Sequence, residues 1–386
     1  MRIARPAPRW PSLSSSLLAA ALACAPGWAG AAPARGLADG QATARTRAEY
    51  AWLLATWGKK TIAGQQDLTW DDRVDMAQRV FDATSRWPAL MGFDFMNTGM
   101  QGAGSDGASG LHQVDEAIAW ARRGGLVAFC WHWRDPALLG TPDANRANFY
   151  AREKDPGKNT AFTIPMKDGR LDTANPAYAQ IDAGIDLVAG ELRRLQDAGV
   201  TVLWRPLHEA AGNGGDGWFW WGRKRSDGEA GSKAYVQLYR HMFDRLVRVH
   251  GLHNLIWVWN GQDAAWYPGD DVVDVVGWDV YDENDRKTYG AQAAIFRKAR
   301  AIPGTPKPVA MSENSFIPDP DKMARENARW LWFMTWNDGR ARAGVSAPDN
   351  FWSGEYYNTS EHKRAVFKHP DVITLDQLPA FLKAHE

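Results

Sequence analysis

Two glutamates in this sequence stand where a buried carboxyl group could carry out chemistry. Glu209 follows the apolar run that starts at Val202, and Glu313 closes the run that starts at Val309. A carboxylate at such a position loses hydration, so it is disfavoured unless it has a partner or a task. Two carboxyl groups that face each other can cleave a glycosidic bond, one as acid and then base, the other as nucleophile or as base toward water. The pattern favours a catalytic pair over two separate ion-pairing or capping residues.

Aromatic residues beside Glu209 indicate the same ligand class. A glycine-rich segment over residues 210–217 follows the glutamate, and four aromatic residues close it: Trp218, Phe219, Trp220 and Trp221. Flat rings pack well against the apolar faces of sugars, and we expect Trp218 and Trp336 to do so. Other tryptophans fit the core equally well, namely Trp220, Trp221, Trp257 and Trp259. The chain holds 21 tryptophans against 14 phenylalanines and 10 tyrosines, which favours a protein that displays ring faces.

Polar side chains near the two glutamates are candidates to bind the substrate. His132 and His208 could hydrogen-bond sugar hydroxyls or orient a glutamate, although a histidine near a core is as often only packed there. Arg205 could keep a carboxylate ionised through paired hydrogen bonds, or it could brace the wall of the fold. Tyr281 is a candidate to hydrogen-bond the nucleophilic carboxylate or to pack in the barrel, and Asp279 is a candidate to contact a sugar hydroxyl.

The elements that must position these residues are short apolar runs alternating with helical patterns. Eight runs read as strands: 61–65, 89–96, 126–131, 200–205, 254–259, 272–279, 308–311 and 330–335. Amphipathic periods predict helices over 181–195 and 235–249, and weaker patterns predict them over 72–85, 111–123, 290–301, 320–329 and 360–367. This alternation is typical of a single (β/α)8 TIM barrel, and of a doubly wound open sheet. The barrel is favoured because polar residues follow strand after strand at the carboxyl end, where barrel enzymes place their active sites.

Composition and charge exclude several classes of partner and cofactor. The 386 residues carry 45 basic and 45 acidic side chains, so no net field attracts nucleic acid or an anionic membrane, and a neutral ligand and a monomer are expected. The zinc motif HExxH, which His208 and Glu209 would begin, needs a histidine at position 212, and that residue is Gly212. Residues 102–107 match GxGxxG, but no acidic residue for a ribose ends the next strand. We therefore expect no metal and no cofactor.

The N-terminus is predicted to be a targeting signal. Arg2, Arg5 and Arg9 precede a short apolar stretch, and a small-residue cleavage pattern ends at residue 31. We expect a signal peptide over 1–31, a disordered lead-in over 32–45 and a catalytic domain over 46–386, secreted or periplasmic. The alternative is a lipoprotein anchored through Cys24. Removal of residues 1–31 would leave Cys130 as the one cysteine, so no disulfide is expected.

The order of several motifs resembles a known family. The motifs are WRPLHE, WFWWG, NLIWVWNGQDAAWYPGD, VVGWDVYD, MSENSFIPDPD, RWLWFMTWN and HPDVITLDQLP, spread over about residues 50–380. Together they resemble glycoside hydrolase family 26, best known for secreted endo-β-1,4-mannanases. The resemblance implies a (β/α)8 barrel and hydrolysis with retention of configuration, with Glu209 as acid/base and Glu313 as nucleophile. It also implies that five residues line the central sugar sites: His132, Trp218, Asp279, Tyr281 and Trp336. His208 stands where many related barrels have asparagine, which favours this family.

One departure and several alternatives remain at this point. The segment over 210–217 is several residues longer than the usual spacing in the family, which leaves the position of Trp218 open. The family implies a neutral β-glycan of the mannan type as substrate, but it also includes β-1,3-xylanases and mixed-linkage β-glucanases. A non-catalytic polysaccharide-binding protein is the alternative from another class, and retention of both glutamates speaks against it.

Overall fold

The computed structural model describes residues 36–71, 74–100, 112–212, 217–228, 230–282, 288–338, 347 and 350–382. Three expectations from the sequence lie outside these residues. They are the signal peptide over 1–31 with Cys24, the GxGxxG match over 102–107, and residues 213–216 of the glycine-rich segment after Glu209.

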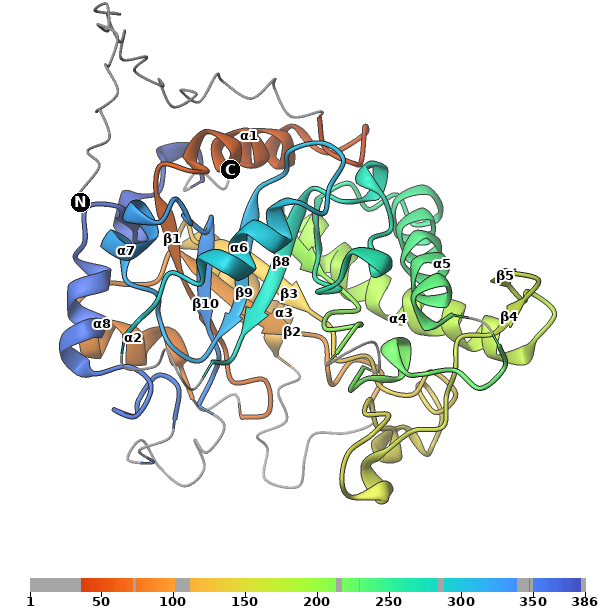
Figure 1. Cartoon of the computed structure of the whole chain (residues 1–386). Helices are drawn as coiled ribbons and strands as arrows, with labels where there is room; N and C mark the ends of the chain where they lie inside the picture. The colour runs from red at the N-terminus through yellow and green to blue at the C-terminus, as the bar shows by residue number, and fades with distance from the viewer. Residues whose placement is uncertain are drawn as a thin grey trace, which may run out of the picture. The chain divides into compact units, whose positions relative to one another are not determined.

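Eight parallel strands form a closed barrel (Figure 1). Their bounds are β1 (Thr61–Gln66), β2 (Leu90–Asp94), β3 (Leu126–Cys130), β6 (Val202–Arg205), β7 (Leu255–Trp259), β8 (Val275–Val280), β9 (Val309–Asn314) and β10 (Trp332–Thr335). Each strand pairs with the next in this order. The last strand, β10, pairs with β1, where Trp332 lies opposite Ile62, and this pairing closes the ring. The strands read as continuous apolar runs because both of their faces are buried. The predicted (β/α)8 barrel is confirmed, and the open sheet is excluded.

Strand β9 runs further than its apolar run indicates. The sequence placed its end at residue 311, but backbone pairing with β8 continues to Asn314, with Glu313 opposite Asp279. The prediction was wrong because it followed the apolar side chains, whereas the paired backbone continues through the polar residues. Glu313 is therefore held within a strand and does not lie in the loop after it.

Helices alternate with the strands along the chain. They are α2 (Met76–Thr84), α3 (Gln113–Arg122), α4 (Pro176–Asp197), α5 (Gly231–Asp244), α6 (Ala293–Arg300), α7 (Pro320–Arg325) and α8 (Ser360–Phe367). The side chains of Asp75, Asn175 and Thr359 accept backbone N–H groups and so fix where three of them begin. Each of the seven predicted helical stretches contains a helix. Among the helices that the structure describes, none has the length and apolar character needed to cross a membrane.

The segment before β1 corrects the predicted disordered lead-in over 32–45. Residues from 36 onward are part of the fold, and α1 (Ala44–Thr56) begins inside the predicted segment. The Ala38 N–H donates to Asp274 Oδ1 at 2.7 Å, and the Tyr50 hydroxyl donates to the Asp274 carbonyl at 3.2 Å. Asp274 immediately precedes β8, so α1 packs at the amino ends of the strands, away from the predicted site (Figure 1). The sequence pattern missed this helix because its apolar residues have little periodicity.

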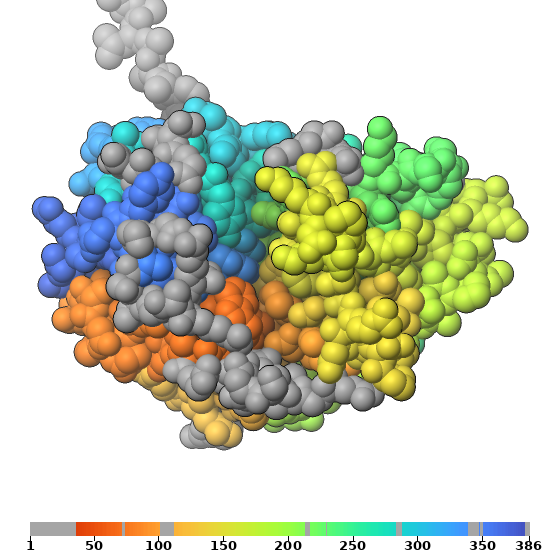
Figure 2. Space-filling model, turned by 90° about the horizontal axis from the view of Figure 1, so that it is seen from below, coloured from red at the N-terminus to blue at the C-terminus, as the bar shows by residue number. Residues whose placement is uncertain are grey.

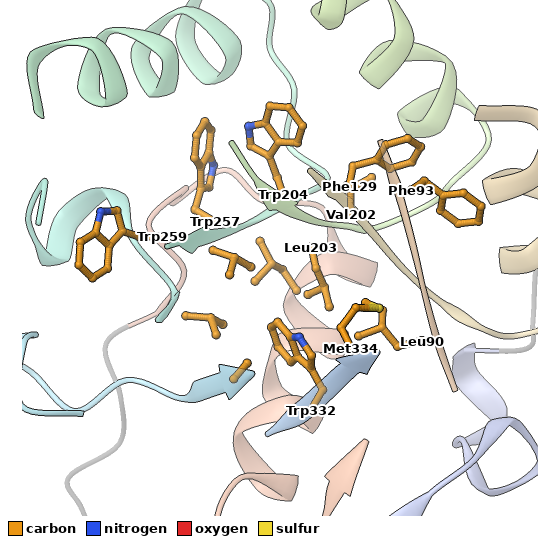
Figure 3. Close-up of a cluster of buried hydrophobic side chains, with 14 of the residues drawn as sticks. Leu90, Phe93, Phe129, Val202, Leu203, Trp204, Trp257, Trp259, Trp332 and Met334 are labelled. Atoms are coloured by element: carbon orange, nitrogen blue, oxygen red, sulfur yellow. The ribbon is translucent and has the colours of Figure 1, made fainter. Parts of the chain in front are cut away.

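Most of the described tryptophans pack in the core, so the expectation that they display ring faces is wrong in the main. On β6 and β7 the residues alternate: Leu203 and Val258 line the inside of the barrel, whereas Trp204 and Trp257 point to the helices (Figure 3). Nine tryptophans in the described ranges are fully buried: Trp131, Trp133, Trp204, Trp220, Trp221, Trp257, Trp259, Trp330 and Trp352. Large rings fill the wide space between a barrel and its helices.

A long insertion between β3 and α4 borders the face at the carboxyl ends of the strands. It holds a small hairpin, β4 (Met166–Lys167) and β5 (Arg170–Leu171), which the sequence pattern did not predict. Figure 2 views this face, with the insertion in yellow on one side and the segment around residue 360 in blue on the other. Two backbone hydrogen bonds join the insertion to the chain after β6. The backbone N–H of Trp220 donates to the Phe149 carbonyl, and that of Ala151 donates to the Trp218 carbonyl.

The seam that closes the barrel gives a stability prediction. A Cβ atom on Gly64 of β1 would lie 2.5 Å from the Phe333 backbone oxygen of β10. We expect Gly64→Ala to lower the free energy of unfolding by about 1–3 kcal/mol, because the backbone of the seam has to move apart. Urea unfolding followed by tryptophan fluorescence measures the change.

Gly190 is the matched control. It lies in α4, and a Cβ atom there would meet nothing within 4 Å. Gly190→Ala should raise the free energy of unfolding by about 0.5–1 kcal/mol, since alanine loses less backbone entropy in a helix. Equal effects of the two substitutions would contradict the tight seam.

Candidate active site

The fold brings Glu209 and Glu313 together at the mouth of the barrel. Glu209 lies in the loop after β6, and Glu313 lies near the end of β9. One carboxylate oxygen from each glutamate and one from Asp279, on β8, lie within 4.8 Å of one another. Three acidic groups this close repel one another when all are ionised, so the site must hold some of them in the protonated form.

Arg205 is the buried cation of this cluster. It ends β6, and its guanidinium donates from Nη2 to Glu313 Oε1 and from Nη1 to Asp279 Oδ2, the latter at 3.2 Å. Burial alone would lower the pKa of Arg205, but the charges of Asp279 and Glu313 outweigh burial and raise it. The arginine is therefore always charged. Its side-chain hydrogen bonds within the described residues go to carboxylates, so it can position the acidic groups.

Glu313 has a second donor in Tyr281. The Tyr281 hydroxyl donates to Glu313 Oε2 at 2.7 Å, which is the contact expected from the sequence. Burial and the negative charges of Glu313 and Asp279 raise the pKa of Tyr281 well above its usual value, so the hydroxyl keeps its proton and stays a donor. Both oxygens of Glu313 thus accept hydrogen bonds, one from a cation and one from a phenol, and these bonds stabilise its negative charge.

Asp279 makes its contacts with protein groups. Its side chain is fully buried, and besides Arg205 it accepts from Asn260 Nδ2 at 2.7 Å. Burial and the charge of Glu313 raise its pKa well above the usual value for aspartate, and Arg205 only partly offsets them. One of its carboxylate oxygens also lies within 4.8 Å of one oxygen of Glu209. The sequence predicted a contact with a sugar hydroxyl, which stays a prediction, and the structure places Asp279 among the residues that line a cleft together with Glu209.

Glu209 is held in an uncommon backbone conformation. Its φ is +50°, and Leu207, two residues before it, has φ of +53°. Non-glycine residues adopt this region at a cost in free energy, and such residues cluster at functional sites. The Glu209 N–H donates to the Asn260 carbonyl at 2.8 Å, which ties the loop after β6 to the loop after β7. Burial and the charge of Glu313 raise the pKa of Glu209 to about 7, against the opposing charges of Arg205 and His132.

The two predicted histidines form a chain that starts at Asp94. The Nδ1 atom of His132 contacts Asp94 Oδ2, and its Nε2 lies 3.2 Å from His208 Nε2. Burial alone would lower the pKa of His132, but the charge and hydrogen bond of Asp94 outweigh burial and raise it. Burial and the charge of His132 lower the pKa of His208 well below its usual value. These opposite pKa shifts favour His132 as the donor and His208 as the acceptor of the contact between them.

The two predicted sugar platforms are both partly exposed at the mouth. The Trp336 ring lies 6.0 Å from that of His132. Trp218 lies under the guanidinium of Arg152, at 4.9 Å, and lines a cleft of about 380 Å³. The other residues that line this cleft are Glu209, Gly212, Gln262, Asp279, Val280, Tyr281, Asp282 and Ile295. Of the six tryptophans weighed from the sequence, the two assigned to sugars are thus partly exposed, whereas Trp220, Trp221, Trp257 and Trp259 are core.

Sequence reasoning missed three residues that complete the site. Asp94 ends β2, and Asn260 directly follows β7, so each was recognisable as a polar residue at the end of an apolar strand. Tyr150 belongs to the insertion after β3. Its ring lies 5.7 Å from that of Phe219, and burial and the charges of Glu153, Glu209 and Glu313 raise its pKa. No strand pattern points to Tyr150, because only the folded insertion brings it there.

Two side-chain groups have the donors and spacing for a metal ion. They are Asp94 with Cys130 and His132, and Glu209 with Asp279 and Glu313. In the first group His132 Nδ1 is taken by Asp94, and the Cys130 thiol donates to the Phe93 carbonyl. In the second group the cation Arg205 already forms ion pairs with Asp279 and Glu313. Direct contacts within the protein thus satisfy both groups, which leaves them poorly suited to a metal.

Comparison with known proteins gives relatives for most of the chain. A curated mannan endo-1,4-beta-mannosidase of Thermothelomyces thermophilus is 37% identical over 89% of this chain and 63% of its own length. Mannan endo-1,4-beta-mannosidase B of a Piromyces species is 30% identical over 86% of this chain and 52% of its own length. This chain thus spans about half to two thirds of the length of these relatives.

Two solved structures that resemble this chain are also named as mannanases. A GH26-CBM35 beta-(1,4)-mannanase of Podospora anserina superimposes with a TM-score of 0.70 at 30% identity, over 90% of this chain and 69% of that one. A beta-mannanase from a symbiotic protist of the termite Reticulitermes speratus, complexed with a gluco-manno-oligosaccharide, gives 0.71 at 31% identity, over 89% of this chain and 97% of that one.

The family model described as Glycosyl hydrolase family 26 matches residues 38–377, which span all eight strands of the barrel and every site residue named above. With its closed barrel and its two glutamates on β9 and after β6, the chain belongs to glycosyl hydrolase family 26.

Proposed function

We propose that this chain is a retaining endo-β-1,4-mannanase, which hydrolyses internal β-1,4-mannosidic bonds of mannan, glucomannan or galactomannan. The observation that carries the proposal is the facing of Glu209 and Glu313, with carboxylate oxygens within 4.8 Å, in a family 26 barrel. The relatives named mannan endo-1,4-beta-mannosidase support the substrate, as does the gluco-manno-oligosaccharide bound to the protist enzyme.

In the first step Glu313 attacks the anomeric carbon of the bound sugar. Arg205 and Tyr281 donate hydrogen bonds to its two oxygens, which stabilises its negative charge and fixes its direction. Glu209 donates its proton to the glycosidic oxygen, and the sugar bonded through that oxygen leaves as an alcohol. The raised pKa of Glu209 suits this role, because the group still holds a proton near neutral pH.

In the second step Glu209, now a carboxylate, takes a proton from water, and that water releases the sugar from Glu313. Loss of the charge on Glu313 in the covalent intermediate lowers the pKa of Glu209, which favours its switch from acid to base. Retaining enzymes keep the two carboxyl groups about 5–5.5 Å apart, and inverting enzymes about 6.5–9.5 Å. One oxygen of Glu209 and one of Glu313 lie within 4.8 Å of each other, which fits the retaining arrangement.

We also propose that the protein is secreted or periplasmic and acts as a monomer. The basic and apolar pattern over residues 1–31 supports export by a signal peptide, and attachment through Cys24 is the alternative. Sequencing the N-terminus of the mature protein distinguishes a cleaved chain from one that begins at an acylated Cys24.

A reducing-sugar assay on soluble polysaccharides tests the substrate. We expect new reducing ends and a rapid fall in viscosity on galactomannan and glucomannan, because an endo-acting enzyme cuts within the chain. Faster hydrolysis of β-1,3-xylan or mixed-linkage β-glucan would contradict the proposed bond specificity. Binding to mannan without new reducing ends would instead indicate a non-catalytic binding protein.

Replacement of each glutamate separates their roles. Glu313→Ala should abolish turnover of mannan and also of 2,4-dinitrophenyl β-mannobioside, because no nucleophile remains. Glu209→Ala should lower kcat/KM on mannan about 10²- to 10⁴-fold. On the dinitrophenyl substrate, whose leaving group needs no proton, the loss in kcat/KM should be far smaller. Circular dichroism checks that both variants are folded, and equal losses on the two substrates in Glu209→Ala would refute its role as the acid.

The raised pKa of Glu209 predicts the alkaline side of the pH profile. The protonated form is the active one, so kcat/KM on mannohexaose should fall as the pH rises through about 7. The value of kcat/KM for 2,4-dinitrophenyl β-mannobioside should lack this decline, since its first step needs no acid. A profile on mannohexaose that stays flat to pH 9 would contradict the assignment.

A further inference from the structure

We propose that Gln262 binds the sugar on the leaving-group side of the cleaved bond and thereby favours sugar over non-sugar leaving groups and acceptors. The inference deepens the proposed function and rests on it. Nothing in the motifs or in the paired carboxylates singled out this residue. It emerges from three features of the loop after β7: its contacts with the loop of Glu209, its backbone conformation and its side chain.

The first feature is the connection between Gln262 and the loop that carries Glu209. Two backbone hydrogen bonds join the loops after β6 and β7: Glu209 N–H to the Asn260 carbonyl at 2.8 Å, and Ala211 N–H to the Gly261 carbonyl at 3.1 Å. Gln262 is the next residue after this pair. Its position is therefore fixed relative to the proposed acid/base.

The second feature is the backbone of Gln262. Its φ is +63°, in the left-handed region that disfavours residues with a side chain. Glycine would fit that conformation without strain, yet a long polar side chain is present. Such an outlier beside an active site supports a role for the side chain itself.

The third feature is the carboxamide of Gln262, which is partly exposed and lines the cleft together with Glu209 and Trp218. Within the described ranges it takes part in no hydrogen bond. Its neighbour Asp263 differs, because that carboxylate accepts the Ala265 N–H at 2.9 Å. An amide with donors and an acceptor, opposite an aromatic ring, is suited to the hydroxyls and the apolar face of one sugar.

The glutamate that lines the cleft indicates which part of the substrate the cleft holds. Glu209 lines the cleft that holds Gln262, whereas Glu313 is not among its lining residues. Glu209 protonates the glycosidic oxygen, so the sugar that leaves with this oxygen occupies the space beside Glu209. His132 and Trp336, from the chain after β3 and β10, are likewise not among the residues that line this cleft. Gln262 therefore faces the leaving sugar, and later the acceptor that replaces it.

Gln262→Gly is the sharpest test, because glycine removes the amide and also relieves the backbone strain. The value of kcat/KM for mannohexaose should fall about five- to tenfold, the loss of roughly one hydrogen bond to the substrate. The value for 2,4-dinitrophenyl β-mannobioside should stay within about twofold, because its leaving group carries no sugar hydroxyls. With added mannobiose as acceptor, the variant should also form fewer transfer products per hydrolysis. Gln262→Asn, which keeps an amide, should recover part of each loss.

Ser85→Gly is the matched control. Ser85 also has a positive φ, of 60°, but it ends α2 on the surface, outside the residues that line the cleft. Both glycine variants should unfold at or above the wild-type temperature, and Ser85→Gly should leave both kcat/KM values unchanged. Unchanged values in Gln262→Gly, or equal losses on the two substrates, would overturn the inference while the mannanase activity stands. A wild-type protein that cleaves neither substrate would refute the proposed function and this inference with it.

Discussion

The buried guanidinium of Arg205 is the interaction on which this site depends. Three carboxyl groups lie within 4.8 Å of one another in a space with little water, and one cation among them cannot neutralise all three. Arg205 binds Glu313 and Asp279 directly, and Tyr281 adds a donor to Glu313. Arg205 and Tyr281 therefore stabilise the negative charge of Glu313, while burial and that charge raise the pKa values of Asp279 and Glu209. One cation thus gives two residues of the same type the different surroundings that their proposed roles as nucleophile and acid require.

The barrel provides this arrangement because its strands all end at one mouth. Arg205, Asp279 and Glu313 belong to three strands, and pairing between β8 and β9 places Asp279 directly opposite Glu313. The loops are held as firmly as the strands: hydrogen bonds join the Glu209 loop to the loop after β7 and join Trp220 to the insertion after β3. Fully buried tryptophans between strands and helices give this mouth a rigid base.

The sequence predicted the barrel, its eight strands and the residues now gathered at the site, because polar residues at the ends of apolar runs are a strong signal. The same signal marks Asp94 and Asn260, which were overlooked. Other features were beyond it: Tyr150 enters from an insertion without strand pattern, and the positive φ of Glu209 and Gln262 arises from contacts between loops. The surplus of tryptophans was misread, since composition does not tell a buried ring from an exposed one. The role of Asp279 was open too, because only burial shows that it faces protein groups.

The account stands on two carboxyl groups that act on opposite sides of one anomeric carbon in two successive steps. Proton NMR of the anomeric signals during the first minutes of mannohexaose hydrolysis tests this most directly. Double displacement at a site held by Arg205 predicts that newly formed reducing ends appear first as the β-anomer and then mutarotate. First appearance of the α-anomer would contradict the account, because it would require direct attack by water.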